Sequence, residues 1–343
     1  MSPLTAIDLF CGAGGLTQGL RKSGFRVVAA VDNAPLAVKA YELNHPGTEV
    51  LTGDICHLSP LQIAAKVGLK PGELDLLAGC PPCQGFSSLR TRRRSPSVND
   101  PRNVLVGQFG RFAEALRPRA LLMENVPGLA KDIRLRLLLS RLRQLDYRLT
   151  YGVLDASEYG VPQRRRRFVL IGLRGRRIGF AEPAKQRRTV RGAIARLKSP
   201  ALSDDPLHNH GEVRSGKVQK RIREIPAEGS LRTMGDAHQL PCHKRTNGFF
   251  DIYARMVWKE PAPTITGGCI NPSKGRFLHP EQHRAITLRE AALLQSFPPH
   301  YKFPLDEGKY RAAELIGNAL PPRFVARQAK EIALALRSES EVR

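Results

Sequence analysis

A cysteine and a glutamate, each placed directly after an apolar run, are the residues of this chain best suited to chemistry. Cys83 stands in the loop Gly79–Ser87, which follows the apolar run Leu74–Ala78 and contains two prolines. A thiolate on such a rigid loop is a nucleophile, and electropositive surroundings favour its formation. Glu124 directly follows the run Ala120–Met123, so its carboxyl could hold a proton beside the thiolate. The pair suits attack on an electron-poor ring.

The same loop allows two other interpretations. Cys80 and Cys83 have the C-x-x-C spacing of redox pairs, but Gly85 would interrupt the helix that such pairs begin. The spacing also occurs in zinc sites, yet the chain has no second C-x-x-C pair to complete four ligands. The cysteines and histidines between His208 and Cys269 are irregularly spaced, and we expect no metal site.

A glycine-rich turn after the first apolar run indicates a ligand site. Gly12 and Gly14 allow the backbone to approach a ligand closely at the start of a helix. Asp32, at the end of the second run, could hold ribose hydroxyls, and Asp54 after the third could accept from an adenine amino group. Thr17 replaces the third glycine of the dinucleotide fingerprint. The pattern therefore favours an adenosine ligand without pyrophosphate, of which S-adenosyl-L-methionine is the commonest.

Strand and helix signals alternate over the first 180 residues and would bring these residues to one edge of a sheet. The alternation predicts an α/β fold with a doubly wound, mostly parallel, Rossmann-like sheet, whose ligands bind at the carboxyl ends of the strands. The expected strands are Leu4–Phe10, Phe25–Val31, Leu74–Ala78, Ala120–Met123 and Phe168–Gly172, and the expected helices are Ala34–Leu43, Val104–Leu116 and Ile133–Leu145.

The periodicity weakens after about Glu182, where turn residues become frequent. Clear helical patterns return only at Thr287–Gln295 and Ala326–Leu336. We therefore expect a catalytic and cofactor-binding domain over residues 1–181, a smaller irregular domain over 182–275, and a C-terminal segment over 276–343 that returns to the first domain.

The charge of the chain indicates a polyanionic partner. Fifty-five lysines and arginines against 31 acids give a formal net charge of +24 and a pI near 10.4. Basic residues gather between Arg164 and Lys198 and again at Arg90–Arg94, which is typical of a phosphate-binding groove. No apolar run is long enough to span a bilayer, and the N-terminus has no signal-peptide pattern. Six irregularly spaced cysteines suggest a reduced, cytosolic protein.

In order along the chain, these blocks resemble those of the C5-cytosine DNA methyltransferases. The Pro-Cys-Gln block around Cys83 and the Glu-Asn-Val block at Glu124 together are highly specific. The matching blocks are Asp8–Gly15, Val31–Tyr41, Gly53–Ile55, Gly79–Ser87, Glu124–Val126, Tyr159–Arg167, Arg289–Pro298 and Gly317–Pro322.

The resemblance implies a role for each matching residue. Cys83 would attack C6 of a flipped-out cytosine, while Glu124 would hydrogen-bond and protonate N3, so that C5 can accept a methyl group from S-adenosyl-L-methionine. Arg165 and Arg167 fall on the family's Gln-x-Arg-x-Arg pattern, whose arginines hold the glutamate and the O2 side of the base. The positions that match cofactor-contacting residues are Phe10, Gly12, Gly14, Asp32, Asp54, Ile55 and Asn318.

The resemblance also implies partners and place. We expect double-stranded DNA as substrate, a possible cognate restriction endonuclease acting on the same site, a monomer, and a bacterial cytoplasmic protein associated with the nucleoid. The segment from about Glu182 to Cys269 takes the place of the target-recognition domain, but residue identities do not reveal the target sequence.

Three departures from the family pattern leave the catalytic positions intact. Asp32 replaces the commoner glutamate, Ala34 replaces a second acid, and Leu320 replaces the usual valine. Two alternatives stay open: an RNA cytosine methyltransferase, although its characteristic Cys-Phe-Thr segment is missing, and a DNA-binding protein that no longer catalyses.

Overall fold

The computed structural model describes residues 3–82, 105–210, 213–235 and 251–342. The chain forms two compact units, each of which we treat by itself. The sheet unit comprises residues 1–159, 166–183 and 320–343, and the loop unit comprises residues 160–165 and 184–319. No helix in the described ranges is long and apolar enough to cross a membrane.

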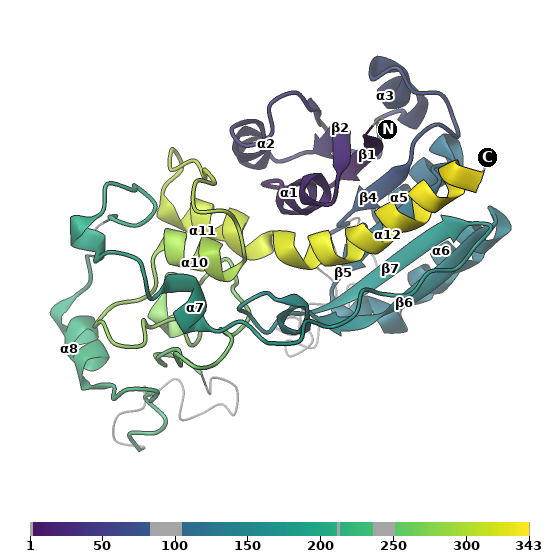
Figure 1. Cartoon of the computed structure of the whole chain (residues 1–343). Coiled ribbons are helices and arrows are strands. Elements are labelled where there is room, and N and C mark those ends of the chain that lie inside the picture. Colours follow the sequence, from purple (N-terminus) through teal and green to yellow (C-terminus); the bar gives the residue numbers. More distant parts are fainter. Residues whose placement is uncertain (1–2, 83–104, 211–212, 236–250, 343) are drawn as a thin grey trace. The chain divides into compact units, whose positions relative to one another are not determined.

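Within the described residues, seven strands build one sheet in the order β3-β2-β1-β4-β5-β7-β6 (Figure 1). Only β7 runs antiparallel to its neighbours, β5 and β6. The strands are β1 (Leu4–Leu9), β2 (Phe25–Asp32), β3 (Glu49–Thr52), β4 (Leu76–Gly79), β5 (Ala120–Asn125), β6 (Tyr147–Asp155) and β7 (Arg166–Arg174). The expected doubly wound, mostly parallel sheet is therefore confirmed. Because the strand order reverses between β1 and β4, ligands are expected at the carboxyl ends of these two strands.

Helices cover both faces of the sheet (Figure 1). In the sheet unit they are α1 (Gly15–Lys22), α2 (Pro35–Glu42), α3 (Pro60–Lys66), α5 (Leu105–Leu116), α6 (Ile133–Gln144) and α12 (Pro322–Val342), with 3₁₀ turns η3 (Pro127–Lys131) and η4 (Ala156–Tyr159). Helices α5 and α6 pack together on one face, while α1 and α12 pack together on the other. Local signals define their starts: the Asp132 carboxylate caps α6 by accepting from the Arg134 N–H at 2.8 Å.

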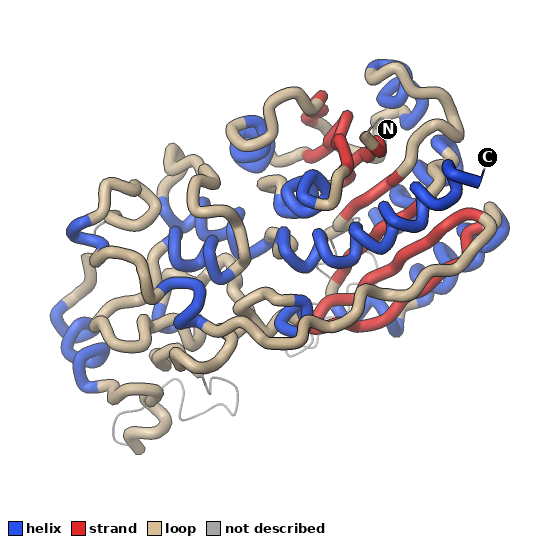
Figure 2. Tube along the Cα trace, in the orientation of Figure 1, coloured by secondary structure: helices blue, strands red, loops and turns tan. Residues whose placement is uncertain are grey.

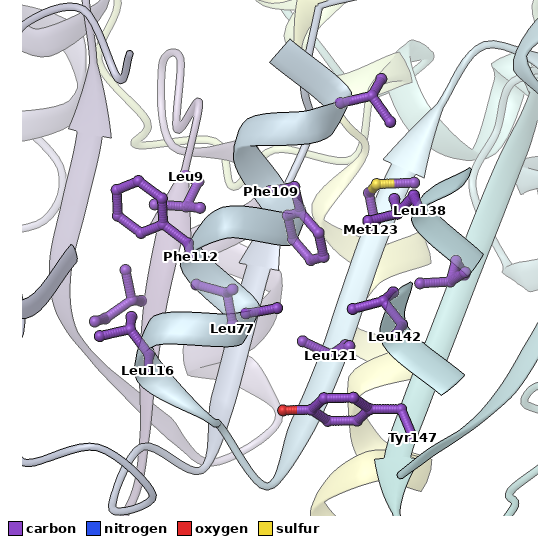
Figure 3. Close-up of a cluster of buried hydrophobic side chains, with 14 of the residues drawn as sticks. Leu9, Leu77, Phe109, Phe112, Leu116, Leu121, Met123, Leu138, Leu142 and Tyr147 are labelled. Carbon is purple, nitrogen blue, oxygen red and sulfur yellow. The ribbon is translucent and has the colours of Figure 1, made fainter. Parts of the chain in front are cut away.

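The core beneath α5 is built from aromatic and aliphatic side chains (Figure 3). Phe109 and Phe112 of α5 are fully buried in one cluster with Leu77 of β4 and Leu121 of β5. Each such side chain contributes roughly 2 kcal/mol by leaving water. These central strands are continuous apolar runs because both of their faces are covered, and this is why they were predictable.

Close approach of α12 to α1 depends on a glycine. A Cβ at Gly19 would lie 2.4 Å from Cβ of Val325 and 2.6 Å from the carbonyl oxygen of Pro322, so only glycine fits. The Ser23 hydroxyl donates to the carbonyl of Ala326 at 3.0 Å. The N-terminal helix α1 and the C-terminal helix α12 are thus packed side by side.

The loop unit has few regular elements (Figure 2). They are α7 (Val190–Ile194), η5 (Pro200–Leu202), α8 (Gly216–Glu224), η7 (Pro272–Lys274), α10 (Leu288–Leu294) and α11 (Lys309–Asn318). Its described strand-like contacts are isolated bridges such as Arg255 to Leu278. A buried arginine supplies hydrogen bonds that regular strands would otherwise provide. All three guanidinium nitrogens of Arg255 donate to backbone carbonyls, at distances of 2.8–3.0 Å. The accepting carbonyls belong to Ile222, Ile225, His279 and Gln282.

The compact units differ from the domain bounds expected from the sequence. Residues 276–319, expected to return to the first domain, belong to the loop unit, and the return begins at Leu320. The physical reason is that α10 packs against α7 and α11. The short segment 160–165 also belongs to the loop unit, although it lies within the expected 1–181 domain.

Candidate active site at the carboxyl ends of the strands

The turn after β1 has the backbone that a glycine-rich loop requires. Gly12 and Gly14 have φ angles of 54° and 87°, and Phe10 has φ of 60°, which is rare for a residue with a side chain. A Cβ at Gly12 would meet nothing within 4 Å, so its conformation, and not crowding, favours glycine here. Gly14 is the N-cap of α1. Open space therefore lies beside a helix N-terminus.

Two carboxylates follow the neighbouring strands at the same edge of the sheet. In the parallel register Asp32 pairs with Thr52, two residues before Asp54. The carboxylate of Asp32 accepts from the Gly12 N–H at 2.8 Å and from the Ala34 N–H at 2.9 Å. The hydrogen bond from Gly12 connects the end of β2 to the glycine turn.

Asp54 is held by its own loop. Its carboxylate accepts from the Cys56 N–H at 2.9 Å, and this bond lowers the pKa of Asp54. The following residue, Ile55, is buried. Six of the seven residues predicted to contact a cofactor thus lie in the sheet unit, at the ends of β1, β2 and β3. The seventh, Asn318, is an exposed residue at the end of α11 in the loop unit.

A buried acid beneath the glycine turn has no role in the sequence prediction. The Asp8 side chain is fully buried and accepts from the Thr17 hydroxyl at 2.7 Å, and the Tyr41 hydroxyl lies 2.8 Å from that of Thr17. Among the described residues, the Asp8 Oδ1 atom has no hydrogen-bond partner. Burial, aided by the nearby Asp32 carboxylate, raises the pKa of Asp8 to about 7. The sequence predicted a strand that includes Asp8, but it gave no signal that the carboxyl would be fully buried.

The end of β4 is anchored although Cys83 itself lies outside the described residues. The Cys80 N–H donates to the Leu9 carbonyl at 3.2 Å, and Asn125 Nδ2 donates to the Pro81 carbonyl at 2.9 Å. A Cβ at Gly79 would lie 2.9 Å from the Leu9 carbonyl oxygen, so glycine permits this approach. Burial and the neighbouring Glu124 carboxylate raise the pKa of the Cys80 thiol well above its ordinary value. Cys80 therefore suits packing better than nucleophilic chemistry.

Glu124 is held by one of the two predicted arginines. Arg167 Nε lies 2.8 Å from Glu124 Oε1, and both side chains are largely buried. The contact follows from the sheet, because β5 and β7 are antiparallel neighbours in which Glu124 pairs with Val169. In the register of β4 and β5, Gly79 pairs with Met123, so the loop toward Cys83 leaves the sheet beside Glu124.

Arg165 is placed differently. It belongs to the loop unit, is 3 % exposed, and donates to the carbonyls of Ile265 at 2.9 Å and Gly317 at 3.0 Å. The two arginines of the Gln-x-Arg-x-Arg pattern are thus on opposite sides of a unit boundary. The family resemblance implies a shared role for both arginines, and the sequence gives no signal of this division.

The described residues contain no cluster of three or more metal-ligating side chains. His208 uses both ring nitrogens, one with the Thr287 hydroxyl at 2.7 Å and one with the Lys198 carbonyl at 2.9 Å. Cys242, His238 and His243 lie outside the described part of the chain.

Comparisons with known proteins identify the class. Residues 4–334 match the model of the C-5 cytosine-specific DNA methylase family, and the chain belongs to that family. It is 34 % identical to the Type II methylase M.HgiDII of Herpetosiphon aurantiacus, covering 98 % of both chains. It is 30 % identical to the Type II methyltransferase M.AgeI of Thalassovita gelatinovora, covering 97 % of this chain and 100 % of that one.

A solved structure agrees with this membership. The fold is similar to that of a DNA modification methyltransferase encoded within an E. coli prophage, with a TM-score of 0.75 and 25 % identity. The alignment covers 97 % of this chain and 99 % of that one. The expected family, and with it a DNA (cytosine-5) methyltransferase, is confirmed.

Proposed function

We propose that this protein methylates C5 of one cytosine within a specific sequence of double-stranded DNA, as a solitary enzyme or as the modification partner of a restriction endonuclease. The observation that carries the proposal is the buried pair of Arg167 and Glu124, at 2.8 Å, beside the strand that leads to Cys83. The named relatives are Type II methyltransferases, which supports a restriction-modification setting.

Three side chains divide the work on the base. Cys83 forms the bond to C6 of the cytosine, and the Glu124 carboxyl hydrogen-bonds N3 and holds a proton there. Once C5 carries the methyl group, the C5 proton is lost and the Cys83–C6 bond breaks, which frees the methylated base and regenerates the thiolate. Arg167 fixes the Glu124 carboxylate through Oε1. The cytosine must leave the duplex stack to reach them, which costs a few kcal/mol.

The glycine turn and its two acids fit S-adenosyl-L-methionine. Phe10, Gly12 and Gly14 would line the open space after β1, and the Asp32 carboxylate would accept from ribose hydroxyls. Asp54 and Ile55 would hold the adenine, and Asn318 would contribute from the loop unit. When bound, the cofactor supplies an electrophilic methyl group.

The loop unit carries exposed positive charge that suits phosphate contacts. Between Ala184 and Lys198, five arginines and lysines besides Lys198 itself are exposed, and no acid interrupts them. They are Lys185, Arg187, Arg188, Arg191 and Arg196. Neutralised phosphates release counterions, so DNA affinity should fall steeply with salt, with a log–log slope of about −0.9 per phosphate. We propose that this unit recognises the target and that a monomer acts on chromosomal DNA in the bacterial cytoplasm.

The decisive experiment is base-resolution methylation sequencing of DNA from cells that express the protein, with Cys83→Ala as control. We expect protected cytosines in one short recurring context, and none with the control variant. Retained methylation by Cys83→Ala would reassign the nucleophile.

The two alternatives that the sequence alone allowed would give different results in vitro. With tritiated S-adenosyl-L-methionine, a tRNA methyltransferase would label tRNA in preference to duplex DNA. A binding protein without activity would bind duplex DNA, label nothing, and bind equally well as the Cys83→Ser variant.

A further inference from the structure

A buried polar cluster in the loop unit joins Arg165 to two glutamines that have no role in the reaction described so far. Its members are Gln163, Arg165 and Gln295, which we call the clamp. Gln163 and Gln295 are fully buried and Arg165 is 3 % exposed. Burying three polar side chains is costly unless each is hydrogen-bonded, so their partners indicate what the cluster holds together.

The two glutamines join segments far apart in the sequence. Gln163 Nε2 donates to Gln295 Oε1 at 2.8 Å, and Gln163 Oε1 accepts from the Ile265 N–H at 2.7 Å. The backbone beside Gln163 pairs with Ala262: the Ala262 N–H donates to the Pro162 carbonyl at 2.9 Å, and the Arg164 N–H donates to the Ala262 carbonyl at 2.8 Å. Segment 160–165 is thereby fixed to the loop that contains Ile265.

The other bonds of the clamp converge on the end of α11. The last carbonyls of a helix have no partner within it and need donors from elsewhere. Gln295 Nε2 donates to the carbonyls of Ile316 at 2.6 Å and Ala319 at 3.3 Å. Arg165 donates to the carbonyl of Gly317 at 3.0 Å. These three carbonyls flank or adjoin Asn318.

Close packing also fixes the backbone at the end of α11. A Cβ at Gly317 would lie 2.1 Å from the carbonyl carbon of Thr266 and 2.2 Å from the nitrogen of Gly267. Helix α11 therefore ends in direct backbone contact with the loop that Gln163 and Arg165 hold. The position of Asn318 is set by the clamp and by this contact together.

The clamp lies close in the chain to two residues with predicted ligand contacts, Arg167 and Asn318. The chain enters the sheet unit after Arg165, two residues before Arg167, and again after Ala319, one residue beyond Asn318. We propose that Gln163, Arg165 and Gln295 are positioning residues that fix Asn318 for S-adenosyl-L-methionine, and that Arg165 makes no contact with the flipped base. This rests on the proposed function, and it separates Arg165 from Arg167, which touches Glu124.

The test measures S-adenosyl-L-methionine binding by calorimetry in the absence of DNA. Gln295→Leu removes the donors to Ile316 and Ala319, and we expect the dissociation constant to rise about tenfold. Asn318→Ala should give a similar rise. If Gln295 acts through Asn318, the double variant should bind no more weakly than the weaker single variant, because the two effects share one contact.

A matched control comes from the sheet unit. Gln328 is also buried, and its Oε1 accepts from the Ala181 N–H at 3.0 Å. Gln328→Leu should lower the thermal midpoint and leave the dissociation constant unchanged. Should Gln295→Leu not fold, Gln295→Glu serves instead, since it retains an acceptor for Gln163 but cannot donate to the α11 carbonyls.

The outcomes distinguish failure of the clamp proposal from failure of the proposed function. Wild-type affinity in both Gln295 variants, or strictly additive losses with Asn318→Ala, would overturn the clamp proposal alone. Failure of the wild-type protein to bind the cofactor would overturn the proposed function and the clamp with it.

Arg165 is tested by removing its supposed partner. With the target site known, Arg165→Lys should raise the dissociation constant for S-adenosyl-L-methionine. It should leave unchanged the ratio of affinities for the target duplex and for a duplex with an abasic site at the target cytosine. A loss confined to the intact target would show contact with the base and refute the positioning role.

Discussion

The two units hold their functional residues by different means. In the sheet unit, Glu124, Asp32 and Asp54 are placed by strand ends in a common register, so the backbone ladder does most of the positioning. In the loop unit, long buried side chains donate to backbone carbonyls, as Arg255 and Arg165 do. The first arrangement is repeated over many bonds, whereas the second is concentrated in a few residues.

Loss of the Arg255 guanidinium should destabilise the protein more than any other substitution considered below. Arg255→Met would leave the buried carbonyls of Ile222, Ile225, His279 and Gln282 without their donor and should cost about 4 kcal/mol. The measurement is chemical unfolding, combined with limited proteolysis mapped to each unit. We expect cleavage to increase in the loop unit first. Arg311→Met, which changes an exposed guanidinium on α11, is the control and should leave proteolysis unchanged. Uniform opening of both units would show that Arg255 does not stabilise the loop unit in particular.

A smaller effect is expected at Asp8, a fully buried carboxyl in the sheet core. Its folded pKa of about 7 lies above the unfolded value of about 3.9, so the folded protein retains a proton that the unfolded chain releases. This contribution to stability is present below about pH 4, declines as the pH rises, and is lost above about pH 7.

Asp8→Asn should remove that dependence. Thermal unfolding at pH 8 should show the variant more stable by about 3 kcal/mol, with the difference shrinking toward pH 4. Asn can still accept from Thr17, so the hydrogen bond at 2.7 Å has a replacement. A stability difference independent of pH would mean that Asp8 does not titrate in this range.

The smallest effect is expected at an exposed ion pair of the sheet unit. Lys66 and Glu49 form an ion pair at 2.6 Å on the exposed surface of the sheet unit. Lys66→Ala should change the free energy of unfolding by less than about 0.5 kcal/mol, because water and salt screen exposed pairs. Urea denaturation at low and high salt measures it. A loss as large as that of Arg255→Met would show that the sheet unit also depends on single side chains.

The same contrast explains what could be predicted from the sequence. Runs such as Ala120–Met123 and Leu74–Ala78 are local patterns of apolar residues, and the expected strands were found there as β5 and β4. The acids that follow such runs could therefore be assigned to one sheet edge. Strand β6 was not predicted, although Tyr147 and Leu149 are buried and Arg148 between them is exposed, an alternation typical of a half-covered strand.

The loop unit had no comparable signal. Arg255 finds its carbonyls some thirty positions upstream and some twenty-five downstream, and no local spacing encodes such partners. The family resemblance likewise implies one role for Arg165 and Arg167, and no local spacing reveals that their hydrogen-bond partners lie in different units. A motif shows which residues occur together, whereas the hydrogen bonds of each side chain decide what it does.

The packing of α12 on α1 at Gly19 has a consequence for synthesis. The sheet unit begins with β1 but needs residues 320–342 to cover α1, while all of the loop unit lies earlier in the chain. At a ribosomal rate of roughly 5–20 residues per second, the first helix waits tens of seconds for its partner. The loop unit can fold during that interval, before the last helix of the sheet unit has been synthesised.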